Sequence, residues 1–121
     1  MFDDKPNWSV RIRVWVECGG EKILGPGRVE LLELIDRHHS IAAAAKHMGM
    51  SYRRAWQLIQ AVNAAAGEPF VEATTGGVGG GGATLTPRGR QAVAEYRRLV
   101  ERLTRAATSE QTLPTSEPPI G

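Results

Sequence analysis

Three polar side chains with paired hydrogen-bonding groups, Arg53, Gln57 and Gln60, recur at helical spacing in the middle of the chain. An arginine can pair with guanine and a glutamine with adenine, each through two hydrogen bonds. The same segment has an apolar face, formed by residues spaced as on one side of a helix: Ala55, Leu58, Ile59 and Val62. A helix that buries one side and presents arginine and glutamine on the other, with Arg54 and Trp56 on its flanks, is typical of a recognition helix in the DNA major groove.

The rest of the sequence offers no convincing catalytic set or metal site. Cys18 is the single cysteine, has no obvious base beside it in the sequence, and cannot form an internal disulfide. His38, His39 and His47 fit no standard ligand spacing and have no cysteine or carboxylate cluster beside them. The glycines from Gly77 to Gly82 contain a G-x-G-x-x-G pattern, but this pattern does not directly open a helix, as a nucleotide site requires. We therefore expect neither an enzyme nor a metal site.

The recognition helix is preceded by the signals of a helix-turn-helix, which spans residues 40–63. Ala42–Ala45 is a run of strong helix formers whose small side chains let another helix approach closely. Gly49 suits the left-handed turn after this first helix, and Ser40 and Ser51 suit the N-caps of the two helices. The alternative for this segment is a plain helical hairpin with a solvated polar face.

A short β-hairpin is expected directly after the helix-turn-helix. Residues 70–72 and 83–86 are β-prone, and the segment between them is rich in glycine. In this position the hairpin is the wing of a winged helix. Its glycine tip lets backbone N–H groups come close to phosphate or enter the minor groove, although the same groups can form an anion nest.

The N-terminal part of the chain also predicts a hairpin. Residues 8–17 alternate strictly between apolar and other residues, which predicts a half-buried strand. Gly19-Gly20 predicts a turn, and residues 22–24 a return strand. Trp8 and Trp15 on this hairpin either pack on a partner subunit or cover their own domain. A helix over 28–38 follows, with an inward face made of Val29, Leu32 and Ile35 and widened by Leu31 and Leu34.

Thr86-Pro87 predicts the start of a long last helix. Its apolar residues are spaced by three and four positions, as in a heptad seam: Val93, Tyr96, Val100, Leu103 and Ala107. We expect this seam to lie in a homodimer; the alternative is that the helix only packs back on the first helix of its own domain. Between residues 86 and 107 six arginines stand against two glutamates, so the helix either lies near phosphate or presents a solvated surface.

Length and composition fit a single soluble domain of 121 residues, with 41% hydrophobic and 23% charged residues. The net charge of +2 is only mildly basic. No apolar run reaches the roughly 18 residues that a membrane span needs, and the acidic start of the chain lacks the apolar core of a signal peptide. With one cysteine, the composition favours a cytoplasmic protein.

Residues 28 to about 105 resemble the N-terminal DNA-binding domain of the ModE-type molybdate-responsive transcriptional regulators, which is itself similar to the LysR-type winged helix. The motifs that carry the resemblance are Gly-Pro-Gly-Arg at 25–28, Ser40-Ile41 with Ala44-Ala45, Ser-Tyr-Arg-Arg-Ala-Trp at 51–56, and the glycine segment from Thr75 to Ala83 leading into Leu85-Thr86. The resemblance implies a dimeric winged-helix DNA-binding protein with the long last helix at the dimer interface.

Full-length members of that family continue into C-terminal domains that bind molybdate, whereas this sequence ends after the last helix and a short tail. We therefore expect no cofactor in this chain, and molybdate enters only through the resemblance. The chain is then a stand-alone regulator of molybdenum-related genes, a constitutive DNA binder, or a regulator that uses another signal. A different reading is an oxyanion-binding or protein-interaction module that does not read DNA sequence.

The expected architecture is α+β and mainly helical: an N-terminal β-hairpin over residues 1–24, a winged helix-turn-helix over 25–86, a dimerisation helix over 87–107 and a disordered tail over 108–121. The expected partners are double-stranded DNA and a second copy of the chain. We expect DNA contacts from the helix-turn-helix and the wing, at Ser40, Ser51, Tyr52, Arg53, Arg54, Trp56, Gln57, Gln60, Thr75, Gly76, Gly77, Gly79 and Gly80.

Overall fold

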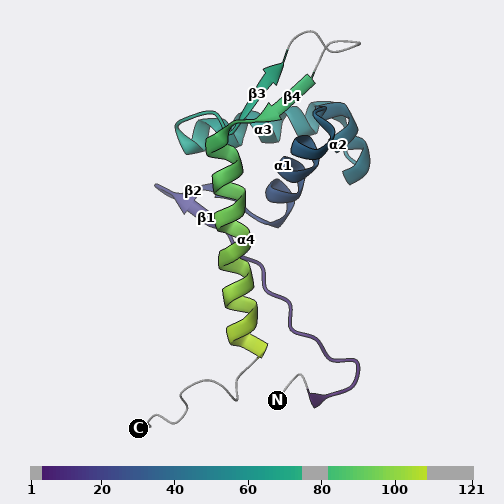
Figure 1. The fold of residues 1–121 in the computed structure, drawn as a ribbon, viewed down its shortest axis with the longest axis vertical. Helices are drawn as coiled ribbons and strands as arrows, with labels where there is room; N and C mark the ends of the chain where they lie inside the picture. The colour runs from purple at the N-terminus through teal and green to yellow at the C-terminus, as the bar shows by residue number, and fades with distance from the viewer. Residues whose placement is uncertain (1–3, 75–81, 109–121) are drawn as a thin grey trace.

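The computed structural model describes residues 4–74 and 82–108, arranged as a winged helix with a long C-terminal helix (Figure 1). Four helices and two small antiparallel sheets confirm the expected mainly helical α+β class within these residues. The elements in chain order are β1 (Val16–Cys18), β2 (Glu21–Leu24), α1 (Pro26–His38), α2 (Ile41–Met48), α3 (Tyr52–Ala66), β3 (Val71–Thr74), β4 (Gly82–Leu85) and α4 (Pro87–Thr108).

Helix α1 is the centre of the core, because it packs against α2, α3, α4 and β4. All five residues expected on its inward face are buried: Val29, Leu31, Leu32, Leu34 and Ile35. Burying an aliphatic side chain of this size stabilises the fold by roughly 1.5–3 kcal/mol, so this helix carries much of the hydrophobic stabilisation.

The helix-turn-helix has the expected start and stop signals. The hydroxyl of Ser40 accepts a hydrogen bond from the N–H of Ala43 at 3.0 Å, and that of Ser51 accepts from the N–H of Arg54 at 3.1 Å. Each hydroxyl thereby satisfies a backbone donor that has no partner within its helix. Gly49 ends α2 with a φ of 69°, a left-handed conformation that favours glycine.

The prediction of a strand over residues 8–17 is wrong for most of that segment. Only residues 16 and 17 of it belong to β1, whereas residues 8–15 form no strand. The alternation is nevertheless real, since Val10, Ile12 and Val14 are half-buried and the residues between them are exposed. Alternating burial reports that a segment has two faces; a strand also needs a hydrogen-bonding neighbour, and β2 pairs only with residues 16–18.

The N-terminal hairpin itself is present but short. Its turn is Gly19-Gly20, with φ values of 61° and 84°. Two successive positive φ angles are typical of the tight turns that suit the twist of a two-stranded ribbon. Beyond the hairpin, residues 8–15 extend away from the wing (Figure 1), and the carbonyl of Val14 accepts a hydrogen bond from the Tyr96 hydroxyl of α4 at 2.9 Å.

Helix α4 begins as expected at Thr86-Pro87. The Thr86 hydroxyl accepts from the N–H of Gly89 at 3.0 Å and donates to the carbonyl of Pro69 at 2.9 Å. A methyl group at Gly89 would overlap the carbonyl of Phe70, so glycine allows the helix to cross the start of β3 closely. Among the described residues, no helix is both long and apolar enough for a membrane span.

Candidate nucleic-acid interface

The predicted recognition helix is α3, and its two faces are disposed as expected. Ala55, Ile59 and Val62 are buried and Leu58 is half-buried. Arg53, Gln57 and Gln60 are exposed together on the opposite side, with Arg54 exposed on one flank. Because no ion pair in the described part of the chain engages Arg53 or Arg54, both guanidinium groups are available to an anionic or base partner. DNA contact by these residues stays a prediction.

Two aromatic side chains lie on the other flank of α3. Tyr52 is 48% exposed and Trp56 is 47% exposed, which is unusual for such large apolar groups. They stand four positions apart on a helix, and Asn63 follows at the spacing that keeps it on the same flank. Since Asn63 contacts β3, this aromatic flank lies on the side of the wing.

Asn63 fixes the wing to the recognition helix. Its Oδ1 accepts from the N–H of Phe70 at 2.9 Å and from that of Val71 at 3.3 Å, while its Nδ2 donates to the carbonyl of Val71 at 3.1 Å. The sequence pattern does not point to this residue. The available signal was an asparagine on the flank of a predicted recognition helix, eight positions before a strand. No local rule links an asparagine in that position to the backbone of the strand.

A second contact fixes the other strand of the wing. Gly82 of β4 forms a β-bridge with Ser40, and the N–H of Ala83 donates to the carbonyl of His39 at 3.2 Å. The start of α2 therefore lies next to the start of β4, and the N-cap residue Ser40 comes close to the wing. Between these two contacts, β3 pairs with β4 from Val71–Leu85 to Thr74–Gly82.

The wing tip falls outside the described residues. This applies to five of the predicted DNA contacts, namely Thr75, Gly76, Gly77, Gly79 and Gly80. The described strands bring the residues that flank that segment, Thr74 and Gly82, to the same end of the sheet. In Figure 1 the two strands project from the domain in the direction opposite to α4.

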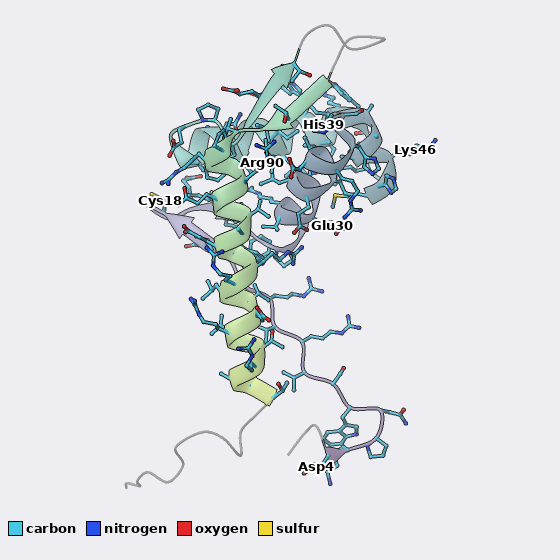
Figure 2. The ribbon with its side chains drawn as sticks, in the orientation of Figure 1. Asp4, Cys18, Glu30, His39, Lys46 and Arg90 are labelled. Atoms are coloured by element: carbon cyan, nitrogen blue, oxygen red, sulfur yellow. The ribbon has the colours of Figure 1, made fainter. Side chains whose placement is uncertain are left out.

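The basic character of α4 is largely neutralised within the domain. Arg88 pairs with Glu68, Arg90 with Asp36, Arg97 with Glu33 and Arg105 with Glu101, at 2.6–3.1 Å. Arg97 donates two hydrogen bonds to the Glu33 carboxylate of α1, and these bonds raise the pKa of Arg97. The sequence left open whether α4 lies near phosphate or presents a solvated surface. For four of its six arginines these pairs favour the solvated surface. Many side chains of α4 extend outward along its length (Figure 2).

The apolar seam of α4 divides into two parts. Val93 and Tyr96 are buried in the core of their own chain, so packing back on the domain accounts for this half. Beyond them Val100 is half-buried, Leu103 is 41% exposed and Ala107 is exposed. Only this distal half offers an uncovered surface to a second copy.

Two of the three histidines lie side by side. The rings of His38 and His47 stack with centroids 4.6 Å apart. In the described ranges, no group of three or more histidine, cysteine or acidic side chains is placed to hold a metal ion. His39 has a left-handed φ of 54° and serves as the C-cap of α1.

Comparison with known proteins identifies the family. Residues 27–90 match the family model of the bacterial regulatory helix-turn-helix proteins, lysR family. The chain is also similar to molybdenum-pterin-binding protein MopB of Rhodobacter capsulatus, with 48% identity over 73 residues that cover 60% of this chain and 27% of that protein. It is similar to the DNA-binding transcriptional dual regulator ModE of Escherichia coli K12, with 41% identity over 76 residues that cover 63% of this chain and 29% of ModE.

Solved structures agree on the fold. The DNA-binding domain of CbnR in complex with DNA superposes with a TM-score of 0.54 at 21% identity, covering 75% of this chain and 97% of that one. VV2_1132, a LysR family transcriptional regulator, superposes with a TM-score of 0.53 at 22% sequence identity, covering 74% of this chain and 28% of that one. The chain spans between 25% and 34% of the length of these curated relatives. By its helix-turn-helix and wing, it belongs to the lysR family of bacterial regulatory helix-turn-helix proteins.

Proposed function

We propose that this chain is a sequence-specific DNA-binding transcriptional regulator, acting as a homodimer in the bacterial cytoplasm. The observation that carries the proposal is the exposed face of α3, on which Arg53, Gln57 and Gln60 stand together with no acidic partner among the described residues. These are side chains suited to paired hydrogen bonds with base edges. Buried residues on the opposite side hold the helix in place, so this face is rigidly presented.

The wing and the N-termini of α2 and α3 supply the contacts that position α3. Ser40 and Ser51 use their hydroxyl oxygens as acceptors in capping bonds, and each hydroxyl retains a proton that it can donate to a phosphate oxygen. Backbone contacts of this kind fix the register of a protein on DNA without reading sequence. Asn63 keeps the wing at a constant position relative to α3, so both can engage one duplex together.

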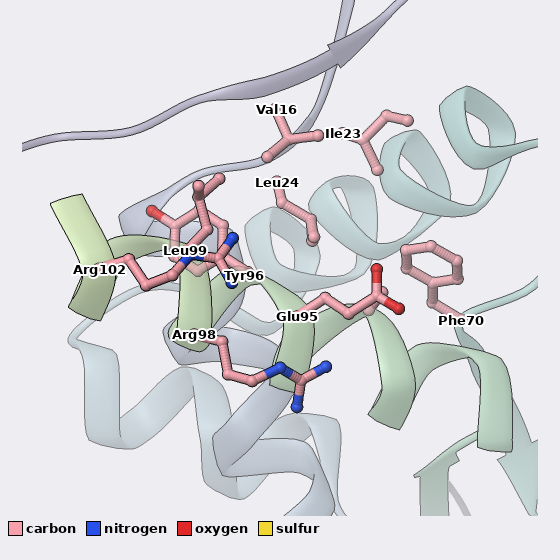
Figure 3. Close-up of a pocket in the computed structure, with 10 residues that line it drawn as sticks. Val16, Ile23, Leu24, Phe70, Glu95, Tyr96, Arg98, Leu99 and Arg102 are labelled. Carbon is pink, nitrogen blue, oxygen red and sulfur yellow. The ribbon is translucent and has the colours of Figure 1, made fainter.

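The distal half of α4 supports the homodimer. One side of it borders an open groove of about 490 Å³, whose lining includes Tyr96, Arg98, Leu99 and Arg102 of α4 and Val16, Ile23 and Leu24 of the N-terminal hairpin (Figure 3). A second copy of α4 would cover Val100, Leu103 and Ala107. To read two half-sites in successive turns of DNA, a two-fold dimer needs its two recognition helices about 34 Å apart.

The link to molybdenum rests on the relatives. MopA and MopB of Rhodobacter capsulatus are named as molybdenum-pterin-binding proteins, and ModE of Azotobacter vinelandii as a molybdenum transport protein. Since the helix-turn-helix part matches a family of regulatory proteins, we propose that this chain regulates genes of molybdate metabolism rather than that it binds molybdate itself. The second candidate, an oxyanion or protein-binding module, is favoured only by the glycine wing, whose N–H groups suit an anion.

Sequencing of the genomic DNA fragments that the purified protein retains tests the proposal. A regulator yields a common motif with two-fold symmetry, and its binding weakens steeply as salt rises. Fragments without a common motif, or binding of molybdate in place of DNA by isothermal titration calorimetry, would support the second candidate.

A further inference from the structure

The N-terminal hairpin lies beside the recognition helix, and a groove of about 260 Å³ separates them. It is lined by Trp15, directly before the hairpin, and Lys22 of β2, by Gly27 and Arg28 of α1, by Met48 and Met50 at the α2–α3 turn, and by Arg54 and Leu58 of α3. Three cations therefore face one small space, and none of its lining residues is acidic. Trp15 and Lys22 precede residues 27–90, the segment that the family model matches, so the hairpin adds something that this model does not contain.

Two of the three cations are held in place by the hairpin. The ammonium of Lys22 lies 4.4 Å from the centroid of the Trp15 ring, a cation–π contact. Nη1 of Arg28 donates to the carbonyl of Lys22 at 2.6 Å. The Trp15 ring in turn packs on Gly25, where a methyl group would overlap it. Because these groups are already ordered, binding an anion would cost them little further conformational entropy.

The position of the groove relative to α3 indicates its partner. Arg54 and Asn63 are nine positions apart, which is about two and a half helical turns and places them on opposite sides of α3. Asn63 holds the wing, so the groove lies on the flank away from the wing. A helix in the major groove has a sugar–phosphate backbone on each side, within a width of about 12 Å. The wing can contact one backbone, and the groove faces the other.

Glu17 is the carboxylate most directly placed to neutralise the groove, because it is the register partner of Lys22 in the hairpin. The described residues nevertheless contain no ion pair between them, and the Lys22 ammonium lies over Trp15 instead. The ammonium and the Arg54 guanidinium thus both remain without an acidic partner in the described ranges, and each keeps hydrogen-bond donors to offer.

We propose that this groove binds a DNA backbone phosphate, with Lys22 and Arg54 as the donors, and that the hairpin is a third DNA-contacting element beside the wing and α3. The inference rests on the proposed DNA-binding function and extends it to a segment outside the matched domain. The partner is recognised by its charge alone, so the contact adds affinity for every sequence and no base preference.

Lys22→Met tests the proposal, because methionine keeps an apolar stem over Trp15 and removes only the charge. Binding is measured against a selected site and a random duplex of equal length, between about 50 and 200 mM salt. We expect the slope of log K against log salt to fall by about 0.9 for both duplexes, the value for one lost phosphate contact. Between 50 and 200 mM salt, a slope smaller by about 0.9 means that the affinity of Lys22→Met falls about 3.5-fold less than that of the wild type. Lys22→Arg keeps the wild-type slope.

Arg11→Met is the matched control. Arg11 is exposed on the segment that precedes the hairpin, and its loss changes the net charge by the same amount. Three results would overturn the proposal that the groove binds a phosphate. They are a wild-type slope for Lys22→Met, an equal fall in slope for Arg11→Met, and a loss of affinity confined to one base position. If Arg53→Ala relaxes base preference while Lys22→Met leaves the slope unchanged, the groove fails and the DNA-binding function stands. If the wild-type protein binds no duplex even at 50 mM salt, both fail.

Discussion

The side-chain amide of Asn63 pairs with both backbone groups of Val71. Nδ2 donates to the carbonyl at 3.1 Å and Oδ1 accepts from the N–H at 3.3 Å, so the amide imitates a neighbouring strand. This pair joins the last turn of α3 to the first residue of β3. The account of DNA recognition depends on that coupling, because a wing and a helix can share one duplex only at a fixed separation.

Replacing Asn63 by alanine should therefore weaken the fold and release the wing. The change leaves partly buried backbone groups of Phe70 and Val71 without partners, at a cost of about 1–3 kcal/mol. Chemical denaturation measures the loss of stability, and hydrogen exchange should increase at residues 70 and 71. Gln60→Ala, on the exposed face of the same helix, serves as the control and should leave both measurements within error. Equal protection of β3 in both variants would argue against the coupling.

Tyr96→Phe removes the hydrogen bond to the carbonyl of Val14 and should cost about 0.5–1.5 kcal/mol. The segment before the hairpin should also exchange faster, since this bond fastens it to α4. Tyr52→Phe is the matched control, because Tyr52 is exposed on α3. If the melting temperature shifts equally in the two variants, the hydrogen bond between Tyr96 and Val14 does not stabilise the fold.

The same tyrosine predicts a change of stability in alkali. Burial raises the pKa of Tyr96, partly offset by Arg97. In the unfolded chain the phenol ionises near its ordinary pKa of about 10, whereas in the folded chain it holds its proton to higher pH. Stability is therefore complete below about pH 10 and falls as pH rises towards the folded pKa. Denaturation midpoints measured from pH 8 to 11 should decline less in Tyr96→Phe than in wild type, whereas Tyr52→Phe should follow wild type.

The dimer proposal predicts the effect of charge on the distal half of α4. Val100→Glu with Leu103→Glu places two carboxylates on the surface that a second helix would cover, so the double variant should be folded and monomeric. Ala94→Glu, exposed on the same helix, should remain dimeric. Sedimentation at tens of micromolar decides between them. A wild-type protein that sediments as a monomer, or a double variant that remains dimeric, would contradict dimerisation through this seam.

Local signals were sufficient for the helix-turn-helix. The serine caps, Gly49 and the spacing of Ala55, Ile59 and Val62 act within a few residues of one another, so the sequence predicts the elements and the exposed face of α3 correctly. The wing follows from β-prone segments on both sides of a glycine run, and the structure confirms its two strands.

Contacts between distant residues account for what the sequence did not reveal. Residues 8–15 of the strand predicted over 8–17 have no pairing strand in the described part of the chain. No pattern within the segment reveals this. The acidic partners of Arg90 and Arg97 are Asp36 and Glu33, which lie more than fifty positions earlier on α1. A count of charges along α4 alone therefore overestimates how many of its arginines lack an acidic partner. Burial of Tyr96 likewise depends on the core around it and divides the apolar seam in two.

The most direct measurement of the central claim compares Arg53→Ala with wild type on a selected site and on a random duplex. Arg53 is exposed opposite the buried face of α3, where it can form two hydrogen bonds with a guanine. Its loss should cost about 1–3 kcal/mol on the selected site, relax preference at one base position, and change binding to random DNA much less. If Arg53→Ala binds the selected site as tightly as wild type and with unchanged base preference, this face of α3 does not read DNA.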